Sequence, residues 1–247
     1  YHIQAAKQLQ GSGISLFKMG LPGTPLIFDW LSDTLPTGAT IGFDGKVITT
    51  AALKDMQRLC AAKNISFKTD LDLIDEVWPE RPPIPDNPIF EHPVKFAGKT
   101  RSEKLHDIRQ EMKEKNTDWF IINSLDDIAW LYNFRGSDIP YCPIALSYAL
   151  ISHDQAWLCI DSTKVPEELA ANFKKDKITL VDYNDIYALA KGIPAGDTIV
   201  LNQKAINSYL FSQINSSCQI LDQVNITTKM KALKNSTEVS HFKNCLE

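Results

Sequence analysis

The sequence predicts an α/β fold in which helices flank a mixed β-sheet. From residue 100 onward, apolar runs of strand length alternate with amphipathic runs of helical period. Residues 145–151 and 156–161 flank the polar turn "SHDQ", which predicts an antiparallel hairpin within an otherwise parallel sheet. Residues 31–48 also recur at 189–206 without a gap, which indicates two copies of one unit.

The elements of the later copy are predicted in order. Thr100 and Glu103 have capping-box spacing ahead of an apolar stripe that reaches Met112, so a helix begins there. "DWFIIN" (118–123) is typical of a buried strand, and the hairpin follows it. The remaining pattern predicts helices at about 165–174, 185–193 and 205–215, and strands at 177–182, 198–202 and 219–221. Asn235 and Glu238 repeat the capping-box spacing and predict a last helix.

The repeat has a constant offset of 158 and seven identities in eighteen positions. It predicts that 27–65 and 185–223 share one helix–turn–strand–helix–strand unit, with Pro36 and Pro194 at the same turn position. Ile41 and Ile199 should each point into the core of their own sheet. The later copy begins near residue 102, so the same offset places the start of the earlier copy before residue 1. Residues 1–88 are therefore expected to be a truncated copy of the same fold.

A proline-rich segment separates the two copies. Six of the thirteen prolines lie between Pro79 and Pro93, which favours a semi-rigid extended linker. A P-x-x-P ligand for a recognition domain is the alternative. We expect a domain boundary near residue 88, giving 1–88 as the later part of a first domain, 89–225 as a complete second domain and 226–247 as a lead-in to a further domain.

Composition excludes several classes of function. A formal net charge of −4 argues against a basic nucleic-acid surface. The uncharged run 139–152 is shorter than the roughly 20 residues of a membrane-spanning helix. Five cysteines without a C-x-x-C pattern favour reduced thiols in the cytoplasm, and the five histidines form no H-x-x-x-H or H-E-x-x-H motif. The sequence therefore predicts neither a metal site nor a catalytic residue in this chain.

The adjacent acids Asp126 and Asp127 could hold a metal ion or move a proton, or they could mark the start of a helix. Ser124 precedes them, and an N-cap serine followed by acids in the first turn suits the helix dipole. Neighbouring helical positions point about 100° apart, which disfavours a shared ion. We therefore predict that Ser124 and Asp127 form a structural cap.

The loop "FRGSDIP" contains Arg135 and Asp138 on either side of a flexible glycine. The two charges could pair across the turn and hold the loop together. The alternative is that they contact a ligand or another protein, because charged loops that follow buried elements often carry function. Arg135 and Asp138 are thus the predicted binding or interface residues, and both should be partly exposed.

Longer stretches resemble a known family. "SLDDIAWLYNFRGSDIPYCPIALSYALI" resembles the second, non-catalytic domain of the long Xaa-Pro aminopeptidases (aminopeptidase P), and "VWPERPPIPDNPIFEHPVKFAGKTRSEKL" resembles the segment before it. "LPGTPLIFDWLSDTLPTGATIGFD" is similar to the later part of their first domain, and "KMKALKNSTEVSHFKNC" to the lead-in to their catalytic domain. Leu246 and Glu247 depart from the continuation expected there, which fits a remnant of expression.

The resemblance implies two creatinase-type domains (the creatinase/prolidase N-terminal-like fold) ahead of a "pita-bread" domain that holds two divalent ions, commonly manganese. Two such ions activate a bridging hydroxide, which attacks the bond between an N-terminal residue and proline. The chain would then be an inactive, non-catalytic region of a cytoplasmic, homo-oligomeric metallo-aminopeptidase, contributing to substrate access and subunit assembly. The parent would act on Xaa-Pro peptides and would need neither nucleic acid nor a membrane. The alternative is a peptide- or protein-binding pseudo-enzyme module whose parent has no peptidase activity.

Overall fold

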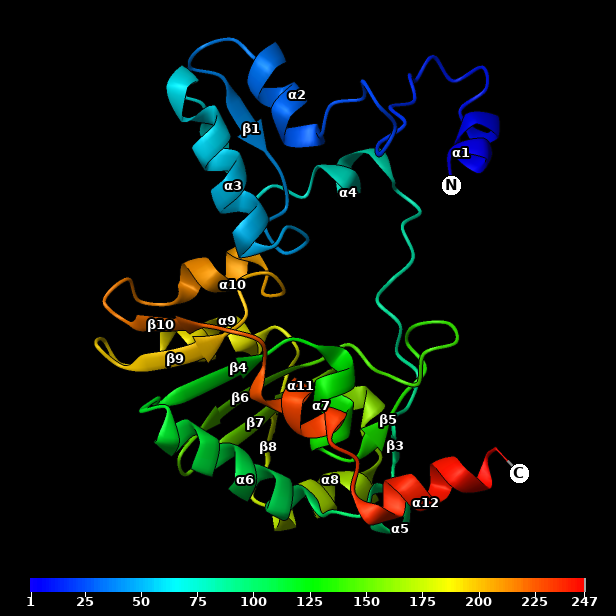
Figure 1. Ribbon diagram of the computed structural model, residues 1–247, viewed down its shortest axis with the longest axis vertical. Helices are drawn as coiled ribbons and strands as arrows, with labels where there is room; N and C mark the ends of the chain where they lie inside the picture. The colour runs from blue at the N-terminus through cyan, green and yellow to red at the C-terminus, as the bar shows by residue number, and fades with distance from the viewer. Residues whose placement is uncertain (247) are drawn as a thin grey trace. The chain divides into compact units, whose positions relative to one another are not determined.

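A computed structural model describes residues 1–246 of the chain (Figure 1). Glu247, half of the expected expression remnant, lies outside the described residues. The described chain forms two compact units, one made of residues 1–42 and 52–68 and the other of residues 43–51 and 69 onward. Each unit is discontinuous in the sequence.

The first unit is small. Its helices are α1 (His2–Gln8), α2 (Ile27–Thr34) and most of α3 (Thr50–Cys60), followed by the 3₁₀ turn η1 (Ala61–Lys63). The strands β1 (Thr40–Gly42) and β2 (Ser66–Lys68) pair in parallel and form a two-stranded sheet. The helix α3 connects these parallel strands, as a parallel pair requires.

The second unit is built on a six-stranded mixed sheet with the order β10-β9-β4-β6-β7-β8. The hairpin strands β6 and β7 are antiparallel, and β6 is also antiparallel to β4, whereas the other neighbouring pairs are parallel. The strands are β4 (Trp119–Ile122), β6 (Tyr148–Ser152), β7 (Ala156–Cys159), β8 (Thr179–Val181), β9 (Thr198–Leu201) and β10 (Gln219–Asp222).

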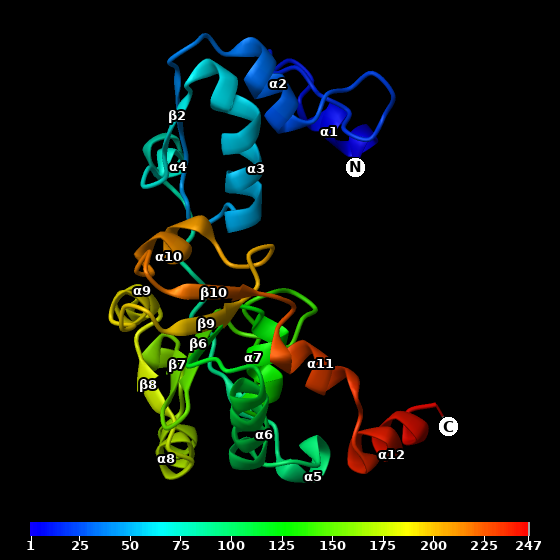
Figure 2. The same ribbon diagram turned by 60° about the vertical axis from the view of Figure 1, so that its left-hand side comes forward.

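Helices cover both faces of this sheet, and Figure 2 shows α9 on one side and α6, α7 and α11 on the other. Because successive strand residues point to opposite faces, Phe120 and Ile122 enter one core and Ile121 enters the other. Apolar residues on both faces explain why β4 is a continuous hydrophobic run. The helices are α6 (Arg101–Glu114), α7 (Leu125–Leu131), α8 (Glu167–Lys175), α9 (Asp185–Lys191), α10 (Ser208–Gln213) and α11 (Ile226–Ala232).

The remaining elements of this unit are short. They are α4 (Leu73–Val77), α5 (Val94–Ala97), the turn η2 (Ser162–Lys164), the last helix α12 (Ser236–Asn244), and the antiparallel strands β3 (Phe90–Glu91) and β5 (Phe134–Arg135). Two expected capping boxes are confirmed, one at Thr100 and Glu103 and one at Asn235 and Glu238. The predicted α/β class, the mixed sheet and the hairpin are also confirmed.

The two repeated segments have the same local geometry. Each has the order helix, strand, helix, parallel strand, and in each the residue after the turn glycine donates to the proline carbonyl (Ala39 to Pro36, 3.2 Å; Asp197 to Pro194, 3.3 Å). Gly38 and Gly196 both have positive φ, 78° and 92°, which explains the glycine at this turn position.

The expectation about the paired isoleucines is half wrong. Ile199 is fully buried, but Ile41 is only half-buried. Ile199 lies on β9 inside the six-stranded sheet, whereas β1 has only β2 beside it among the described residues. A two-stranded sheet cannot bury both of its faces.

Within the second unit, the segment 43–51 pairs with the equivalent part of the later copy. Thr49 is bridged to Asn207, its own counterpart at the offset of 158. Around this bridge, the Thr50 amide donates to the Ile206 carbonyl (2.9 Å) and the Ser208 amide donates to the Ile48 carbonyl (2.8 Å). These reciprocal bonds accompany the assignment of residues 43–51 to the second compact unit.

Candidate functional site: the cavity beside Arg135

The candidate site begins where α7 ends and β5 starts. β5 pairs with β3, so that Arg135 lies opposite Phe90. Asn133, just before β5, has a positive φ of 49°, a conformation that asparagine tolerates better than most residues. This turn brings the chain out of the buried helix α7 and places Arg135 at the edge of the core.

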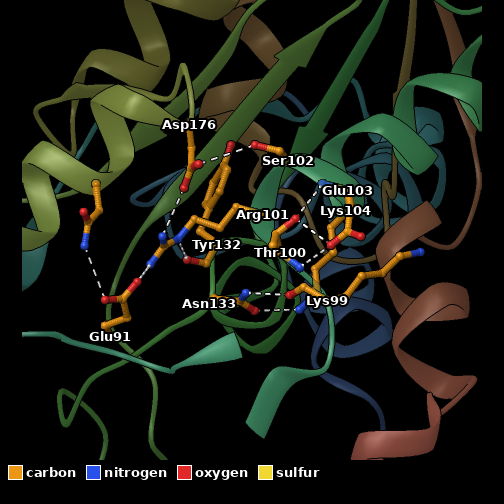
Figure 3. Close-up of polar contacts among 11 residues, drawn as sticks. Glu91, Lys99, Thr100, Arg101, Ser102, Glu103, Lys104, Tyr132, Asn133 and Asp176 are labelled. Atoms are coloured by element: carbon orange, nitrogen blue, oxygen red, sulfur yellow. Dashed lines mark hydrogen bonds and ion pairs between the residues drawn. The ribbon is translucent and has the colours of Figure 1, made fainter. Parts of the chain in front are cut away.

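Side chains from α6 fix this turn (Figure 3). Arg101 donates from Nε to the Tyr132 carbonyl (2.6 Å) and forms ion pairs with Glu91 and Asp176. Lys104 donates from Nζ to the Trp130 carbonyl (2.7 Å) and to Oδ1 of Asn133 (2.6 Å). The carbonyls at the end of α7, which have no partner within the helix, are therefore bound by two cations.

Lys104 is a buried lysine without a carboxylate partner among residues 1–246. Its side chain is 1% exposed, and its Nζ lies 4.3 Å from the centre of the Trp130 ring. Burial lowers the pKa of Lys104 to about 7, an effect that the carboxylate of Glu238 partly opposes. Lys104 thus combines a structural role with titration near neutral pH.

Asp138 differs from expectation. It is 8% exposed and so buried rather than partly exposed, and its partner is Lys164 (2.7 Å), not Arg135. The same oxygen, Oδ2, also accepts a hydrogen bond from the Leu146 amide (2.7 Å). The loop folds back on itself, since the Asp138 amide donates to the Ile144 carbonyl, and this turns the carboxylate inward. Asp138 therefore anchors the 136–144 loop from inside.

Arg135 is half-buried, and it forms no ion pair with any of the residues 1–246. Its Nη1 donates to the carbonyl oxygens of Ala129 (3.1 Å) and Phe134 (2.7 Å). Burial lowers the pKa of its guanidinium, and the Glu238 carboxylate opposes this effect. The structure thus separates Arg135 and Asp138, which the sequence had grouped: one lines a cavity and the other supports the loop.

The predicted cap at the start of α7 is wrong in its chemistry. Ser124 occupies the N-cap position, but its side chain makes no capping hydrogen bond; its Oγ instead accepts from Nδ2 of Asn225 (2.9 Å). Asp127 is 1% exposed and accepts from the hydroxyls of Thr227 (3.0 Å) and Thr228 (2.6 Å). These groups join α7 to α11 because α11 packs against the start of α7.

Asp126 and Asp127, which were not expected to hold one metal ion together, both contact a single lysine. Lys231 of α11 forms ion pairs with both carboxylates, at 2.7 Å in the case of Asp127. A long flexible lysine reaches both acids from a neighbouring helix, although their own directions diverge. Partial burial raises the pKa of Asp126, but the hydrogen bond and the positive charge of Lys231 together outweigh it, so the pKa lies below its ordinary value. The acid pair is thus a latch between two helices.

A cavity of about 810 Å³ lies between α5, α7, α12 and the 136–144 loop. Its lining includes Phe96, Trp130, Arg135, Ile144, Glu238 and Phe242. Phe96 lies between two histidine rings, with centroids 6.0 Å from His92 and 5.3 Å from His241. The pKa of His92 is lowered, first by burial and then by the positive charges of Arg135 and Lys104.

Metal chemistry has no donor set in this part of the chain. Within residues 1–246, no three side chains of histidine, cysteine, aspartate or glutamate are grouped so that they could hold a metal ion. The carboxylates around the cavity are engaged with Lys231 or with the cap of α12. We therefore derive no metal-dependent step for these residues. No helix among residues 1–246 is long and apolar enough to span a membrane.

Sequence reasoning missed Lys164, Lys104 and Lys231. Two of them are buried although lysine is rarely so, and nothing in their local pattern marks them. Lys231 faces Asp126 across 105 positions of sequence. One indirect signal pointed to a lysine partner for Asp138. Asp138 follows a glycine turn and lies next to apolar residues, and a carboxylate that is buried in such a place requires a cation from another part of the chain.

Comparisons with known proteins agree with this architecture. The model of the creatinase/prolidase N-terminal domain family matches residues 80–238. A probable Xaa-Pro aminopeptidase P from Leptosphaeria maculans is 33% identical over 99% of this chain, and aminopeptidase P1 from Arabidopsis thaliana is 36% identical over 75% of it. The chain spans 42% and 28% of the lengths of these relatives.

A solved structure is similar over nearly the whole chain. The X-prolyl aminopeptidase from Caenorhabditis elegans, described as a cytosolic enzyme with a di-nuclear active site, superposes with a TM-score of 0.89 at 29% identity. The alignment covers 99% of this chain and 41% of that enzyme. Sequence and structure thus agree along the chain, which is related to Xaa-Pro aminopeptidases and belongs to the creatinase/prolidase N-terminal domain family.

Proposed function

We propose that this chain is the non-catalytic N-terminal region of an Xaa-Pro aminopeptidase. The observation that carries the proposal is the match to such enzymes over 99% of the chain, while the chain accounts for only 41–42% of the matched proteins. Residues 1–88 and 89–225 would be the two copies of the domain, and 226–247 would lead into the hydrolytic part. The parent enzyme would cleave the bond before proline in the cytoplasm.

The surface around the cavity supports a role in assembly and substrate access. Large apolar side chains are exposed there, among them Ile139 (38%), Tyr141 (104%) and Phe242 (60%). Exposed apolar groups that gather at one end of a molecule commonly mark an interface. The buried pair of Asp138 and Lys164 holds the loop that carries two of them. This end of the unit would therefore face the hydrolytic part or a second subunit.

The position of α12 adds to the proposal. Asn235 caps α12 and also donates from Nδ2 to the Ala97 carbonyl at the end of α5 (2.8 Å). The C-terminal helix is therefore fixed beside the cavity, and Figure 1 shows α12 next to α5. The parent would hold its two divalent ions, which we take to be manganese, outside residues 1–246, because residues 1–246 contain no group of side chains that could bind a metal ion.

The proposal predicts that the 247-residue protein does not hydrolyse a fluorogenic Xaa-Pro peptide with manganese, zinc or cobalt added. Turnover that a chelator abolishes would contradict the assignment of a non-catalytic region. The alternative, a pseudo-enzyme that binds peptides, is tested by the downstream reading frame. Carboxylate and histidine metal ligands encoded there, together with activity of the longer protein, support the peptidase, and their absence supports the pseudo-enzyme.

A further inference from the structure

We propose that the cavity beside Arg135 is a binding site for a carboxylate that is attached to an apolar residue, as at the C-terminal end of a peptide. The proposal rests only on the residues of this cavity and does not require the parent to be a peptidase. It assigns Arg135 as the group that binds the carboxylate, and the aromatic side chains around it as the walls that hold the apolar part.

Within residues 1–246, no carboxylate around the cavity lies close enough to Arg135 to form an ion pair with it. Asp126 is paired with Lys231 at the cavity wall. Glu238, the other acid in the lining, accepts a hydrogen bond from the Asn235 amide (3.0 Å) in the cap of α12. Asp138 is three positions away from Arg135 but is turned inward to Lys164. None of these carboxylates is ion-paired with Arg135 within residues 1–246, although the charge of Glu238 acts on it from a longer distance. The cavity lining holds three basic side chains (Arg135, Lys231 and Lys234) against two acidic ones (Asp126 and Glu238).

An uncompensated, half-buried guanidinium is unfavourable unless something binds it. Nη1 of Arg135 is already bound to the Ala129 and Phe134 carbonyls, which fixes the plane of the group. The Nε and Nη2 donors have no partner among residues 1–246, and this side of a guanidinium can bind both oxygens of a carboxylate. The arginine is therefore held in place and still has free donors.

The walls of the cavity favour an apolar neighbour for that carboxylate. Phe96, Trp130, Ile144 and Phe242 line it, and its volume of about 810 Å³ falls within the roughly 300–1,000 Å³ typical of small-ligand sites. His92, half-buried at the same wall, adds a further donor when it is protonated. A short peptide that ends in leucine or phenylalanine combines the required charge and apolar surface.

The test compares three probes with the 247-residue protein by isothermal titration calorimetry at pH 7. N-acetyl-leucyl-phenylalanine presents a C-terminal carboxylate, and its amide lacks one. N-acetyl-aspartyl-phenylalanine amide carries a side-chain carboxylate instead. We expect the acid to bind at least about tenfold more tightly than its amide, as for a charge-assisted hydrogen-bonded pair in a partly buried site. Tighter binding of the aspartyl amide than of the acid would overturn the C-terminal assignment.

Two arginine variants make the test specific. Arg135→Gln should abolish the difference between acid and amide. Arg109→Gln is the matched control, because Arg109 is also half-buried, donates from Nε to a backbone carbonyl (Ser152, 3.0 Å) and lies outside this cavity. It should keep the full difference. Equal binding of acid and amide by the wild type, or an unchanged preference in Arg135→Gln, would refute the proposal.

A second readout keeps the result interpretable if Arg135→Gln disturbs folding. In ¹H–¹⁵N spectra of the wild type, the side-chain Nε–H signal of Arg135 should shift on addition of the acid and stay unchanged with the amide. The Nε–H signal of Arg109 should not move with either probe. Shifts of both arginine signals, or of neither, at saturating acid would also refute the site.

Discussion

Replacing Asp138 by asparagine should destabilise the second unit far more than the loss of a surface charge would. The side chains of Asp138 and Lys164 are 0% and 1% exposed, and their charged atoms are 2.7 Å apart. Asparagine keeps the shape and can still accept from the Leu146 amide, so the change chiefly removes the negative charge. Lys164 would remain buried and charged without a counterion. Removing one partner of such a pair typically costs about 3–5 kcal/mol.

Urea denaturation at pH 7, followed by circular dichroism, measures this cost. Asp161→Asn is the matched control, since Asp161 is a half-exposed loop carboxylate that bonds to the amide and hydroxyl of Thr163 and forms no ion pair within residues 1–246. We expect it to change the free energy of unfolding by about 1 kcal/mol or less. The double variant Asp138→Leu/Lys164→Met removes both charges and should recover most of the lost stability, because the desolvation cost disappears with the pair.

Two outcomes would refute a buried ion pair between Asp138 and Lys164. Either Asp138→Asn lowers the free energy of unfolding by less than about 1 kcal/mol, or the double variant is no more stable than Asp138→Asn alone. Either result would mean that Lys164 finds another partner or that water reaches it. The amide hydrogen exchange of Leu146 reports separately on the loop, and it should accelerate in Asp138→Leu/Lys164→Met even where global stability recovers.

Three further results are expected. Asp127→Ala should lower the free energy of unfolding by about 2–4 kcal/mol, because it leaves the buried hydroxyl of Thr227 and the buried amide donor of Asn225 unsatisfied. Asp126→Ala removes an exposed ion pair and should lower it by about 1 kcal/mol or less. Equal losses in urea denaturation would contradict the proposed connection between α7 and α11. The pKa of Lys104 is about 7 in the folded chain and 10.5 in the unfolded chain, so the unfolded state binds more protons between these two pH values. The free energy of unfolding should therefore rise with pH across that window, by at most about 1.4 kcal/mol per pH unit. The same slope in Lys104→Met would contradict this. Gly136→Ala would place a Cβ 2.8 Å from that of Ala145, and it should lower the midpoint of urea unfolding by the equivalent of about 1–3 kcal/mol; an unchanged midpoint would show that the loop can shift away.

Local signals in the sequence predicted local structure well. The capping box at Thr100 and Glu103 and the hairpin around "SHDQ" depend on residues a few positions apart, and both form as expected. The repeat also identified a turn in which Pro36 and Pro194 accept the same backbone bond. These features require only short-range geometry, which residue spacing encodes directly.

The candidate site was harder to predict because its chemistry is assembled from distant segments. Asp127 meets Thr227 across 100 positions, and Asp138 meets Lys164 across 26. Ser124 fits the pattern of a cap, yet Asn225 binds its hydroxyl once α11 packs against α7. Arg135 was a predicted binding residue, but the separate role of Asp138 follows only from the direction in which the loop folds.

The reciprocal bonds around Thr49 and Asn207 have a consequence for how this region can be divided and how it can change. Each copy supplies the other with backbone partners that its own sequence does not provide, so cutting the chain at residue 88 would leave the amides of Thr50 and Ser208 on opposite pieces, each without its acceptor. A protein made of residues 89–225 alone should therefore have unpaired backbone groups where residues 48–50 are bound in the longer chain. The carbonyls of Ile48 and Ile206 accept the two reciprocal hydrogen bonds, so a substitution at Ile48 also alters the environment of its counterpart Ile206. Positions 158 apart in this stretch are thus expected to vary in concert among homologues, as the two halves of a symmetric dimer interface do.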